Sequence, residues 1–368
     1  MTPDAPMAAA ATADAVRTSL GRVVDPEIRR PITELDMVRA VTVDGGTATV
    51  ELVLTIIGCP AAATIEQDVR AAVLSTPGIT DLDLTIGVMT VPEREALVAR
   101  LRGTRTTQFG PDTLTKIYAI TSGKGGVGKS TLTANLAVAL AAQGLKVGLV
   151  DADVFGFSIP GILGLGGPGQ EAAKPTKVGD LMMPPSAYGV QVISIGMFVE
   201  SGAAVSWRGP LLHRTIQQFL TDVWFGDLDV LLLDLPPGTG DVAISIGQLL
   251  PHAEVLVVTT PQPAAAEVAE RSGLVARQTG QTVIGVIENM TGELFGSGGG
   301  EAVAARLGVP VLARIPLSVP LRAGGDVGAP VVLSSPSDPA AVAILNLAAS
   351  LAARGRDLSG KKLPLTPR

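Results

Sequence analysis

The sequence predicts an α/β fold, with a doubly wound, mostly parallel sheet preceded by a small α+β domain. With 368 residues, of which 46% are apolar, the chain is long enough for one large core and a smaller companion. Its second part alternates helical stretches with short runs rich in Val, Ile and Leu, and these runs do not alternate polar with apolar residues. Strands covered on both faces have this pattern, which is typical of parallel sheets.

The predicted strands are five or six residues long. We expect them at Ile117–Thr121, Lys146–Val150, Gln191–Ile195, Asp229–Leu233, Glu254–Thr259, Val283–Ile287 and Val311–Ile315. Helices are expected in the intervals, because parallel strands need crossover connections. A last helix is expected from Pro339 to near Gly355, since Ser337 or Asp338 can cap it and proline suits its first position.

The N-terminal part has a different pattern, which predicts a separate domain. We expect a small α+β domain over residues 1–102, a polar linker over 103–115, a large domain over 116–355 and a loose tail over 356–368. The elements expected in the small domain are an Ala-rich helix from Ala8, a strand pair from Val38 to Ile56 around Gly45-Gly46, a helix from Pro60 to Leu74, a strand from Asp81 to Met89 and a helix from Pro92.

Charge and hydropathy argue against two classes of partner. A formal net charge of −6 does not suit a surface that neutralises nucleic-acid phosphates. Residues 1–20 have no basic head before an apolar core, and every apolar run is shorter than the roughly 20 residues of a membrane helix. We therefore expect a cytoplasmic protein that binds neither nucleic acid nor membrane.

A glycine-rich loop between a predicted strand and a predicted helix indicates a nucleoside triphosphate site. Glycines let backbone N–H groups curl around phosphates, a lysine reaches the β- and γ-phosphates, and a serine hydroxyl ligates Mg²⁺. The alternative is a simple glycine-rich turn, which the strand and the helix on either side disfavour. The residues assigned to the nucleotide are Gly123, Gly125, Gly126, Val127, Gly128, Lys129, Ser130 and Thr131.

A carboxylate at the end of the predicted strand Asp229–Leu233 completes this site. Asp234 follows the strand directly, and the sequence then continues through two prolines to Gly238. Because ligands bind at the carboxyl edge of a parallel sheet, we expect Asp234 to hold Mg²⁺ through water. Gly238 is expected to present an N–H group to the γ-phosphate. The alternative for Asp234 is a turn or helix-capping residue.

The glycine loop resembles the deviant Walker A motif of the MinD, ParA, ArsA and NifH ATPases, in which Lys124 is the additional lysine. This resemblance implies a homodimer in which Lys124 reaches the partner's phosphates and stabilises their charge. It assigns Asp153 to orienting the attacking water and Asp151 to the surroundings of Mg²⁺. It also assigns Asn289 to reading adenine and Pro316 to a loop that closes over the base. The alternatives are that Lys124 is a solvated loop lysine, that Asp151 is a solvated turn acid and that Asn289 is an ordinary loop residue.

Further motifs lie outside the nucleotide site. They are Trp207-Arg208-Gly209-Pro210, Thr260-Pro261-Gln262, Phe295 to Gly300 and Arg314 to Leu317, with Asp25 to Pro31 and Gly58 to Ala61 in the N-terminal part. The first four resemble motifs of the Mrp/ApbC iron–sulfur cluster assembly proteins, and the N-terminal two resemble the SufT-like domain that precedes their ATPase domain. This resemblance implies ATP-dependent assembly or transfer of clusters, with iron–sulfur apoproteins or assembly factors as partners.

The chain departs from this family at the cluster ligands. Members that carry clusters usually have Cys-x-x-Cys shortly after a Glu-Asn-Met motif, where two chains supply four thiolates to one 4Fe–4S cluster. Here Thr291 to Leu294 contains no cysteine and runs straight into Phe295, so a cluster held in the usual way is not expected.

Cys59, the single cysteine, is a candidate iron–sulfur ligand. It precedes Pro60 at the start of a predicted helix, whose dipole would lower the pKa of the thiol. The alternative is a small buried residue that packs the domain.

We therefore expect a slow ATPase of the Mrp type, active as a homodimer, with ATP and Mg²⁺ as cofactors. One alternative is a ParA- or MinD-like positioning ATPase, for which a basic face or a basic amphipathic C-terminal helix would be expected. Another is a binding module that has lost catalysis, which is disfavoured because the residues expected to hydrolyse ATP are all present. The catalytic assignments are Lys124, Lys129 and Asp153, and the metal assignments are Ser130, Asp151 and Asp234.

Overall fold

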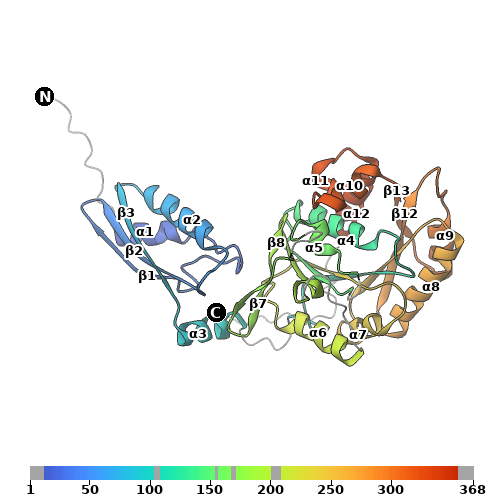
Figure 1. Ribbon diagram of the computed structural model, residues 1–368, viewed down its shortest axis with the longest axis horizontal. Coiled ribbons are helices and arrows are strands. Elements are labelled where there is room, and N and C mark those ends of the chain that lie inside the picture. Colours follow the sequence, from blue (N-terminus) through green and yellow to red (C-terminus); the bar gives the residue numbers. More distant parts are fainter. Residues whose placement is uncertain (1–11, 103–107, 154–155, 167–170, 200–208, 355–368) are drawn as a thin grey trace. The chain divides into compact units, whose positions relative to one another are not determined.

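A computed structural model describes residues 12–102, 108–153, 156–166, 171–199 and 209–354 of the chain (Figure 1). Four expected features fall wholly or partly outside these residues: the helix start at Ala8, part of the linker, the motif residues Trp207-Arg208 and the C-terminal tail. The chain divides into two compact units. One consists of residues 1–106 with residues 176–183, and the other of residues 107–175 with residues 184–368.

The larger unit is built on one eight-stranded sheet with the order β13-β12-β11-β4-β10-β5-β9-β8. All its neighbouring strands are parallel except β8 and β9, which form an antiparallel pair at one edge. The predicted doubly wound sheet is confirmed, and strand ends shift by at most one residue except in β12, which is longer than predicted. The strands are β4 (Lys116–Ser122), β5 (Val147–Asp151), β8 (Ser186–Ala187), β9 (Val190–Ser194), β10 (Val230–Asp234), β11 (Glu254–Thr259), β12 (Thr282–Thr291) and β13 (Val311–Pro316).

Helices cover both faces of this sheet (Figure 1), which is why most residues of its central strands are apolar and buried. One face carries α4 (Lys129–Ala141), α5 (Ile159–Ile162), α10 (Val319–Val327), α11 (Val331–Ser334) and α12 (Pro339–Ala353). The other carries α6 (Gly209–Thr221), α7 (Asp241–Leu249), α8 (Pro263–Gln278) and α9 (Gly299–Leu307). The turn η1 (Ile195–Met197) follows β9.

The place of β4 in the sheet fixes where a ligand can bind. The strand lies between β10 and β11, and its chain continues into α4 on one face of the sheet. In open α/β sheets, ligands bind beyond the carboxyl ends of strands at the point where the strand order reverses. The carboxyl ends of β4, β5 and β10 meet at this edge, so the loops that follow them converge.

The smaller unit is a three-stranded sheet with two helices packed on it. The predicted strand pair is β1 (Val38–Asp44) and β2 (Thr47–Leu54), and β3 (Asp81–Val88) joins β2 in parallel. Helices α1 (Ala13–Leu20) and α2 (Ala62–Leu74) bury their apolar faces against this sheet, and α3 (Val91–Arg102) follows it. The fully buried side chains of this core include Val16, Leu20, Ala48, Val50, Leu52, Ile65, Val69 and Val73.

A hairpin that the sequence does not predict completes the smaller unit. Its strands β6 (Thr176–Val178) and β7 (Leu181–Met183) pair with each other and with no other strand among the described residues. In the chain the hairpin lies between α5 and β8 of the larger unit. Strands of three residues are too short to show a hydrophobic period, which is why sequence patterns do not reveal them.

Candidate functional site

The glycine loop of residues 123–128 has the shape of a phosphate cradle. It joins the buried end of β4 to the first turn of α4, as the sequence predicts. Gly126 and Gly128 have φ angles of 77° and 79°, a region that favours glycine. At Gly128 the packing is also tight, because a Cβ atom there would lie 2.4 Å from Nδ2 of Asn289. Helix α4 therefore begins with its N–H groups directed at the loop, which suits an anion.

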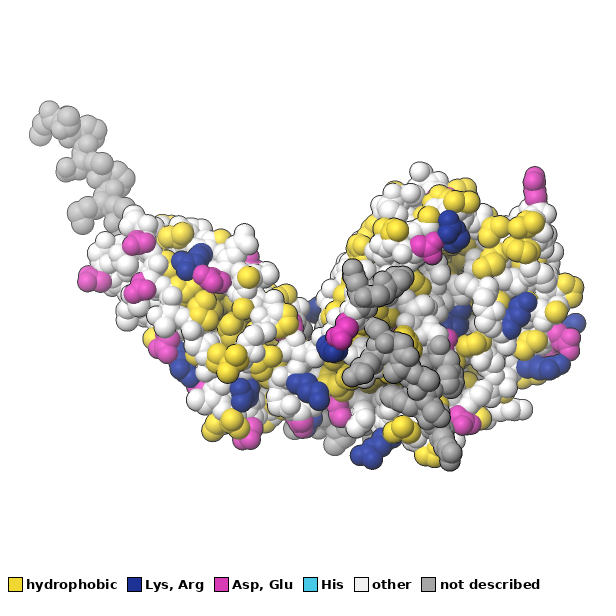
Figure 2. Space-filling model, viewed as in Figure 1, with side chains coloured by type: hydrophobic (Ala, Val, Ile, Leu, Met, Phe, Trp, Pro, Cys, Tyr) yellow, Lys and Arg dark blue, Asp and Glu magenta, His cyan; other side chains and the backbone are white. Residues whose placement is uncertain are grey.

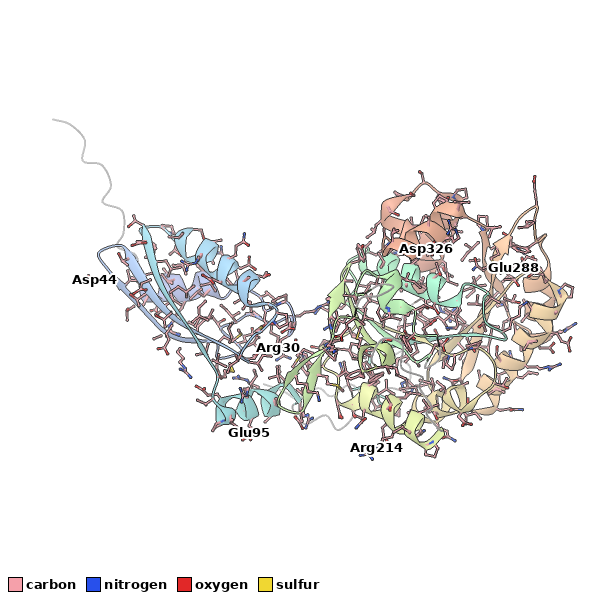
Figure 3. All side chains as sticks on the ribbon, in the orientation of Figure 1. Arg30, Asp44, Glu95, Arg214, Glu288 and Asp326 are labelled. Carbon is pink, nitrogen blue, oxygen red and sulfur yellow. The ribbon has the colours of Figure 1, made fainter. Side chains whose placement is uncertain are left out.

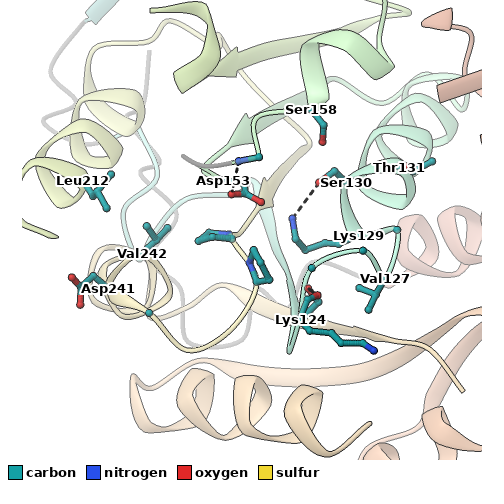
Figure 4. Close-up of a pocket in the computed structure, with 18 residues that line it drawn as sticks. Lys124, Val127, Lys129, Ser130, Thr131, Asp153, Ser158, Leu212, Asp241 and Val242 are labelled. Atoms are coloured by element: carbon teal, nitrogen blue, oxygen red, sulfur yellow. Dashed lines mark hydrogen bonds between the residues drawn. The ribbon is translucent and has the colours of Figure 1, made fainter. Parts of the chain in front are cut away.

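Lys129, Ser130 and Asp234 form a connected set beneath this loop. The Lys129 ammonium donates a hydrogen bond to Oδ2 of Asp234 at 2.7 Å, and the Ser130 hydroxyl donates to the same oxygen at 2.6 Å. Lys129 also donates to the Ser130 hydroxyl at 3.3 Å, the contact dashed in Figure 4. Asp234 is completely buried and Lys129 is 6% exposed, so the ion pair is shielded from water. The structure thus brings together three residues assigned from the sequence.

Thr133 is a member of this set that sequence reasoning missed. Its hydroxyl donates to Oδ1 of Asp234 at 2.8 Å, one turn of α4 beyond Lys129. A threonine inside a helix is common, and the four-residue spacing from a phosphate-loop lysine is the only signal that could have identified it. With Thr133 in place, both carboxylate oxygens of Asp234 have donors.

Asp151 lies behind this set rather than in it. The ends of β5 and β10 pair so that Asp151 stands beside Asp234. Asp151 is completely buried, and its carboxylate accepts hydrogen bonds from the Ser194 hydroxyl at 2.9 Å and from the Asp153 N–H at 3.2 Å. Burial, together with the charge of Asp234, raises the pKa of Asp151 well above its usual range. The structure therefore does not direct Asp151 into the cavity of the glycine loop.

Asp153 and Gly238 differ in how they relate to the cavity. Asp153 lines it, and its carboxylate accepts the Gly156 N–H at 3.1 Å. Gly238, with φ of 91°, donates its N–H to the Ser122 carbonyl at 2.8 Å and does not line the cavity. The expectation of an N–H directed at the γ-phosphate is therefore not met at Gly238 in this conformation, because the loop closes on β4 first.

The glycine loop opens into a cavity of about 900 Å³ (Figure 4). Its size suits the phosphates and sugar of a nucleotide, since small-molecule sites measure about 300–1,000 Å³. Several of its wall residues come from the loop before α7, which the sequence indicates, and from α6 and α7, which it does not. These are Leu212, Pro236, Pro237, Gly240, Asp241 and Val242.

Lys124 occupies a position unlike that of Lys129. Lys124 is exposed, and Figure 4 shows its side chain directed away from Lys129. The Lys124 carbonyl accepts a hydrogen bond from the Ser122 hydroxyl at 3.1 Å, so the backbone at this residue is held while the side chain is not. Within one chain, the Lys124 ammonium therefore lies outside the set that surrounds Asp234.

A second cavity, of about 1070 Å³, shares Gly128, Thr131 and Ser158 with the first. Asn289 and Pro316, the residues assigned to the base, line it. Figure 2 shows hydrophobic side chains gathered over the ends of β12 and β13 and over α10, which border this cavity.

Asn289 is held by the glycine loop that it adjoins. It is 4% exposed and donates from Nδ2 to the Val127 carbonyl at 2.8 Å. Beside it, Met290 adopts a φ of 61° where the register of β12 and β13 shifts. Such backbone strain in a residue other than glycine often marks a functional site.

The loop after β12 is the segment in which the family resemblance implies a cysteine pair, and this chain has none there. It turns back on itself through backbone hydrogen bonds between Gly292 and Gly296. Glu288, completely buried beside it, accepts the N–H groups of Gly298 and Gly300 at 2.8 and 3.0 Å (Figure 3). No three His, Cys, Asp or Glu side chains gather as a metal site would require within the described part of the chain.

Cys59 lies in the smaller unit, before α2. It is 6% exposed, and its thiol faces the Glu27 carboxylate with 3.8 Å between sulfur and Oε2. Burial raises the pKa of Cys59 to about 11, and the charges of Glu27 and Asp25 contribute to the rise. The prediction that the helix dipole lowers this pKa is therefore wrong, because desolvation outweighs the hydrogen bond with the Ala61 backbone.

These features place the chain in the class of P-loop NTPases, because a glycine loop and a buried Lys-Asp pair lie at the edge of a doubly wound sheet. Within that class, the family model for NUBPL iron-transfer P-loop NTPases matches residues 113–352. The model for iron–sulfur cluster assembly proteins matches residues 13–83. The chain therefore belongs to the iron–sulfur cluster carrier family of P-loop NTPases.

Curated relatives agree along nearly the whole chain. An iron–sulfur cluster carrier protein of Mycobacterium tuberculosis is 50% identical over 373 aligned residues, which cover 96% of each chain. A protein of the same name from Bacillus subtilis is 40% identical over 322 residues, with 83% of this chain and 88% of that one covered. These matches favour the iron–sulfur interpretation over the ParA- or MinD-like alternative.

Two solved structures resemble the larger unit. A nucleotide-binding protein from Archaeoglobus fulgidus, in complex with ADP, is 34% identical with a TM-score of 0.51 and covers 61% of this chain and 92% of its own. The septum site-determining protein MinD from Pyrococcus horikoshii, complexed with Mg-ADP, is 27% identical with a TM-score of 0.51. It covers 68% of this chain and 100% of its own. Among the described residues, no helix is both long enough and apolar enough to span a bilayer.

Proposed function

We propose that the chain binds ATP with Mg²⁺ in the glycine-loop cavity and hydrolyses it slowly to drive iron–sulfur cluster assembly or transfer. The observation that carries this proposal is the buried Lys129–Asp234 pair with Ser130 at the floor of a nucleotide-sized cavity. An ammonium held there at 2.7 Å from a carboxylate is positioned to exchange that partner for phosphate oxygens when a nucleotide enters.

The residues present fit Mg²⁺. The Ser130 hydroxyl and the Asp234 carboxylate converge within 2.6 Å, and both are hard oxygen donors of the kind that Mg²⁺ binds. We therefore assign the metal to these two residues, with Asp151 behind them as part of the electrostatic surroundings. When bound, Mg²⁺ would neutralise charge on the β- and γ-phosphates.

Asp153 and the second cavity complete the assignment. The Asp153 carboxylate borders the first cavity, which suits a residue that orients the attacking water. We assign the adenine to the second cavity, against Asn289 and Pro316, because that cavity adjoins the glycine loop at Gly128 and Thr131. The amide of Asn289 can pair with the donor and acceptor edge of adenine.

We expect Lys124→Ala to reduce turnover by about a thousandfold while ATP affinity changes less than about threefold. The exposed Lys124 side chain points away from Lys129, so in the homodimer that we propose its charge would act on the partner's phosphates, as an arginine finger does. The measurement is ATP affinity by fluorescent-analogue titration beside steady-state turnover. Lys146→Ala, which removes an exposed lysine elsewhere, is the matched control. Equal losses of affinity and turnover would make Lys124 a ligand of its own loop.

We propose iron–sulfur apoproteins or assembly factors as partners and the cytoplasm as the site of action. Family membership supports the iron–sulfur role. The smaller domain matches the model for iron–sulfur cluster assembly proteins, and the larger domain that follows it matches the model for iron-transfer NTPases. Cys59 is the single thiol that this chain can offer to a cluster. The raised pKa of Cys59 makes its thiolate rare at neutral pH, which disfavours it as a lone ligand.

Anaerobic reconstitution with iron and sulfide is expected to give fewer than one 4Fe–4S cluster per dimer. Such a cluster requires four thiolates, and a dimer of this chain has only two cysteines, the Cys59 of each chain. Iron content and the absorption spectrum measure the outcome, with ATP turnover compared before and after. A stable cluster at one per dimer that survives Cys59→Ala would require ligands other than cysteine.

A further inference from the structure

The β6–β7 hairpin belongs to the smaller unit by its contacts and to the larger unit by its chain connections. Residues 176–183 pack with the N-terminal unit, whereas the residues immediately before and after them belong to the P-loop unit. Val178, Leu181 and Met183 are each 1% exposed, so the hairpin is part of a packed core. The two units are consequently joined by three crossings of the chain.

Three contacts fix the hairpin on the N-terminal unit. The Thr176 hydroxyl donates a hydrogen bond to Oε1 of Glu27 at 2.6 Å. Asp180 forms an ion pair with Arg102 of α3 at 2.8 Å. Gly179, at the turn with φ of 63°, has so little space that a Cβ atom would lie 3.2 Å from the Val98 side chain.

The residue that receives the Thr176 hydrogen bond is also the partner of Cys59. Glu27 accepts from Thr176 with one carboxylate oxygen and faces the Cys59 thiol with the other. Asp25 holds the loop in place, because its Oδ1 accepts the N–H groups of Glu27 and Ile28 at 2.9 and 2.8 Å. Thr176 is 7% exposed and Cys59 6%, so the hairpin and the carboxylate–thiol pair share one buried region.

Residues on either side of the hairpin in the sequence line the nucleotide cavities. Upstream, Ser158 lines both cavities and Pro160 lines the second. Downstream, Gly196 lines the second cavity. A ligand bound in these cavities therefore contacts the chain on both sides of the hairpin.

We propose that the β6–β7 hairpin is a lid over the Glu27–Cys59 pair, and that ATP bound in the P-loop unit shifts the equilibrium between its docked and undocked states. The control of the lid by ATP rests on the proposed nucleotide site, whereas the lid itself does not. When docked, the lid keeps Cys59 from reagents and partners. When undocked, it leaves Glu27 without its hydroxyl donor and opens the thiol to attack.

Cys59 is the only cysteine, so alkylation by N-ethylmaleimide, followed by mass spectrometry, reports this lid in the full-length protein. The double variant Thr176→Val with Asp180→Asn removes the hydrogen bond and the ion pair while keeping side-chain volume. Because a hydrogen bond to a charged group stabilises docking, we expect alkylation to become about tenfold faster. Thr176→Ser keeps a hydroxyl and is expected to react at nearly the wild-type rate.

The control is the double variant Thr49→Val with Asp83→Asn on the exposed face of β2 and β3, which should react at the wild-type rate. Circular dichroism establishes that each variant is folded. Unchanged alkylation in the folded hairpin variant would overturn the lid, as would equal acceleration in the control. A Thr176→Ser rate as fast as that of the double variant would also overturn it.

The nucleotide arm uses a non-hydrolysable ATP analogue with Mg²⁺, whose binding is measured separately by calorimetry. We expect saturation to change the alkylation rate of wild-type protein at least about threefold, since Ser158, upstream of the hairpin, lines both cavities and Gly196, downstream of it, lines the second. Bound analogue with an unchanged rate would overturn the coupling. Failure of the analogue to bind would contradict the proposed nucleotide site, and the variant comparison would still decide the lid.

Discussion

Replacing Lys129 with alanine is expected to lower ATP turnover and ATP affinity each by about a hundredfold or more. The Lys129 ammonium is buried at the floor of the cavity and would exchange Asp234 for phosphate oxygens. Charge-assisted hydrogen bonds of this kind are worth about 1.5–3 kcal/mol each, and the lysine would make more than one. Turnover and affinity fall together because the same charge acts on the bound ATP and on the transition state.

The measurement is ATPase rate and calorimetric affinity, with Lys146→Ala as the control of equal charge change on an exposed residue. Thermal unfolding of the variant distinguishes a lost ligand from a lost fold. Turnover within tenfold of wild type in a folded Lys129→Ala protein would mean that the site of hydrolysis lies elsewhere.

Asp234→Ala is expected to reduce the free energy of unfolding of the larger unit by about 3–5 kcal/mol. Removing one partner of a buried ion pair leaves the other charge without compensation. Here the variant strands the Lys129 ammonium and removes the acceptor of two hydroxyl groups, those of Ser130 and Thr133. The double variant Lys129→Ala with Asp234→Ala is expected to recover part of the loss, because no buried charge then remains unpaired.

Tryptophan fluorescence during urea unfolding is a suitable measurement, since neither tryptophan of the sequence lies within residues 1–106 or 176–183, which form the smaller unit. Asp112→Ala, which removes an exposed carboxylate of the same unit, should change stability by less than about 0.5 kcal/mol. An equal effect of the Asp234 and Asp112 variants would show that the buried pair contributes little.

The large sheet could be predicted because most of its strands are buried on both faces and are therefore rich in apolar residues. The strand from Glu254 to Thr259 was predicted to the residue, and β12 was cut short because polar residues such as Glu288 and Asn289 continue it. Those polar residues stay in the strand because the protein supplies partners for them, Gly298 for Glu288 and Val127 for Asn289. Tertiary contacts of this kind leave no local signal.

Site residues that belong to a local sequence motif could be predicted. Properties that depend on distant contacts or on burial could not. Lys129, Ser130 and Asp234 meet as expected, because strand order brings the ends of β4 and β10 together. The direction of the Asp151 carboxylate depends on Ser194, which is 43 residues away in the sequence. The pKa of Cys59 depends on how deeply the thiol is buried, and spacing alone contains no information on depth.

The hydrogen bond from Asn289 to the Val127 carbonyl has a consequence for how this protein could be re-engineered. Gly128 leaves no room for a side chain beside that amide, so the residues that would face the base and those that would face the phosphates are clamped into one rigid block. A designer who exchanged Asn289 to accept another nucleobase would loosen the phosphate loop at the same time. Altered base preference would therefore have to be sought at other lining residues of the second cavity, such as Pro316 and those of α10.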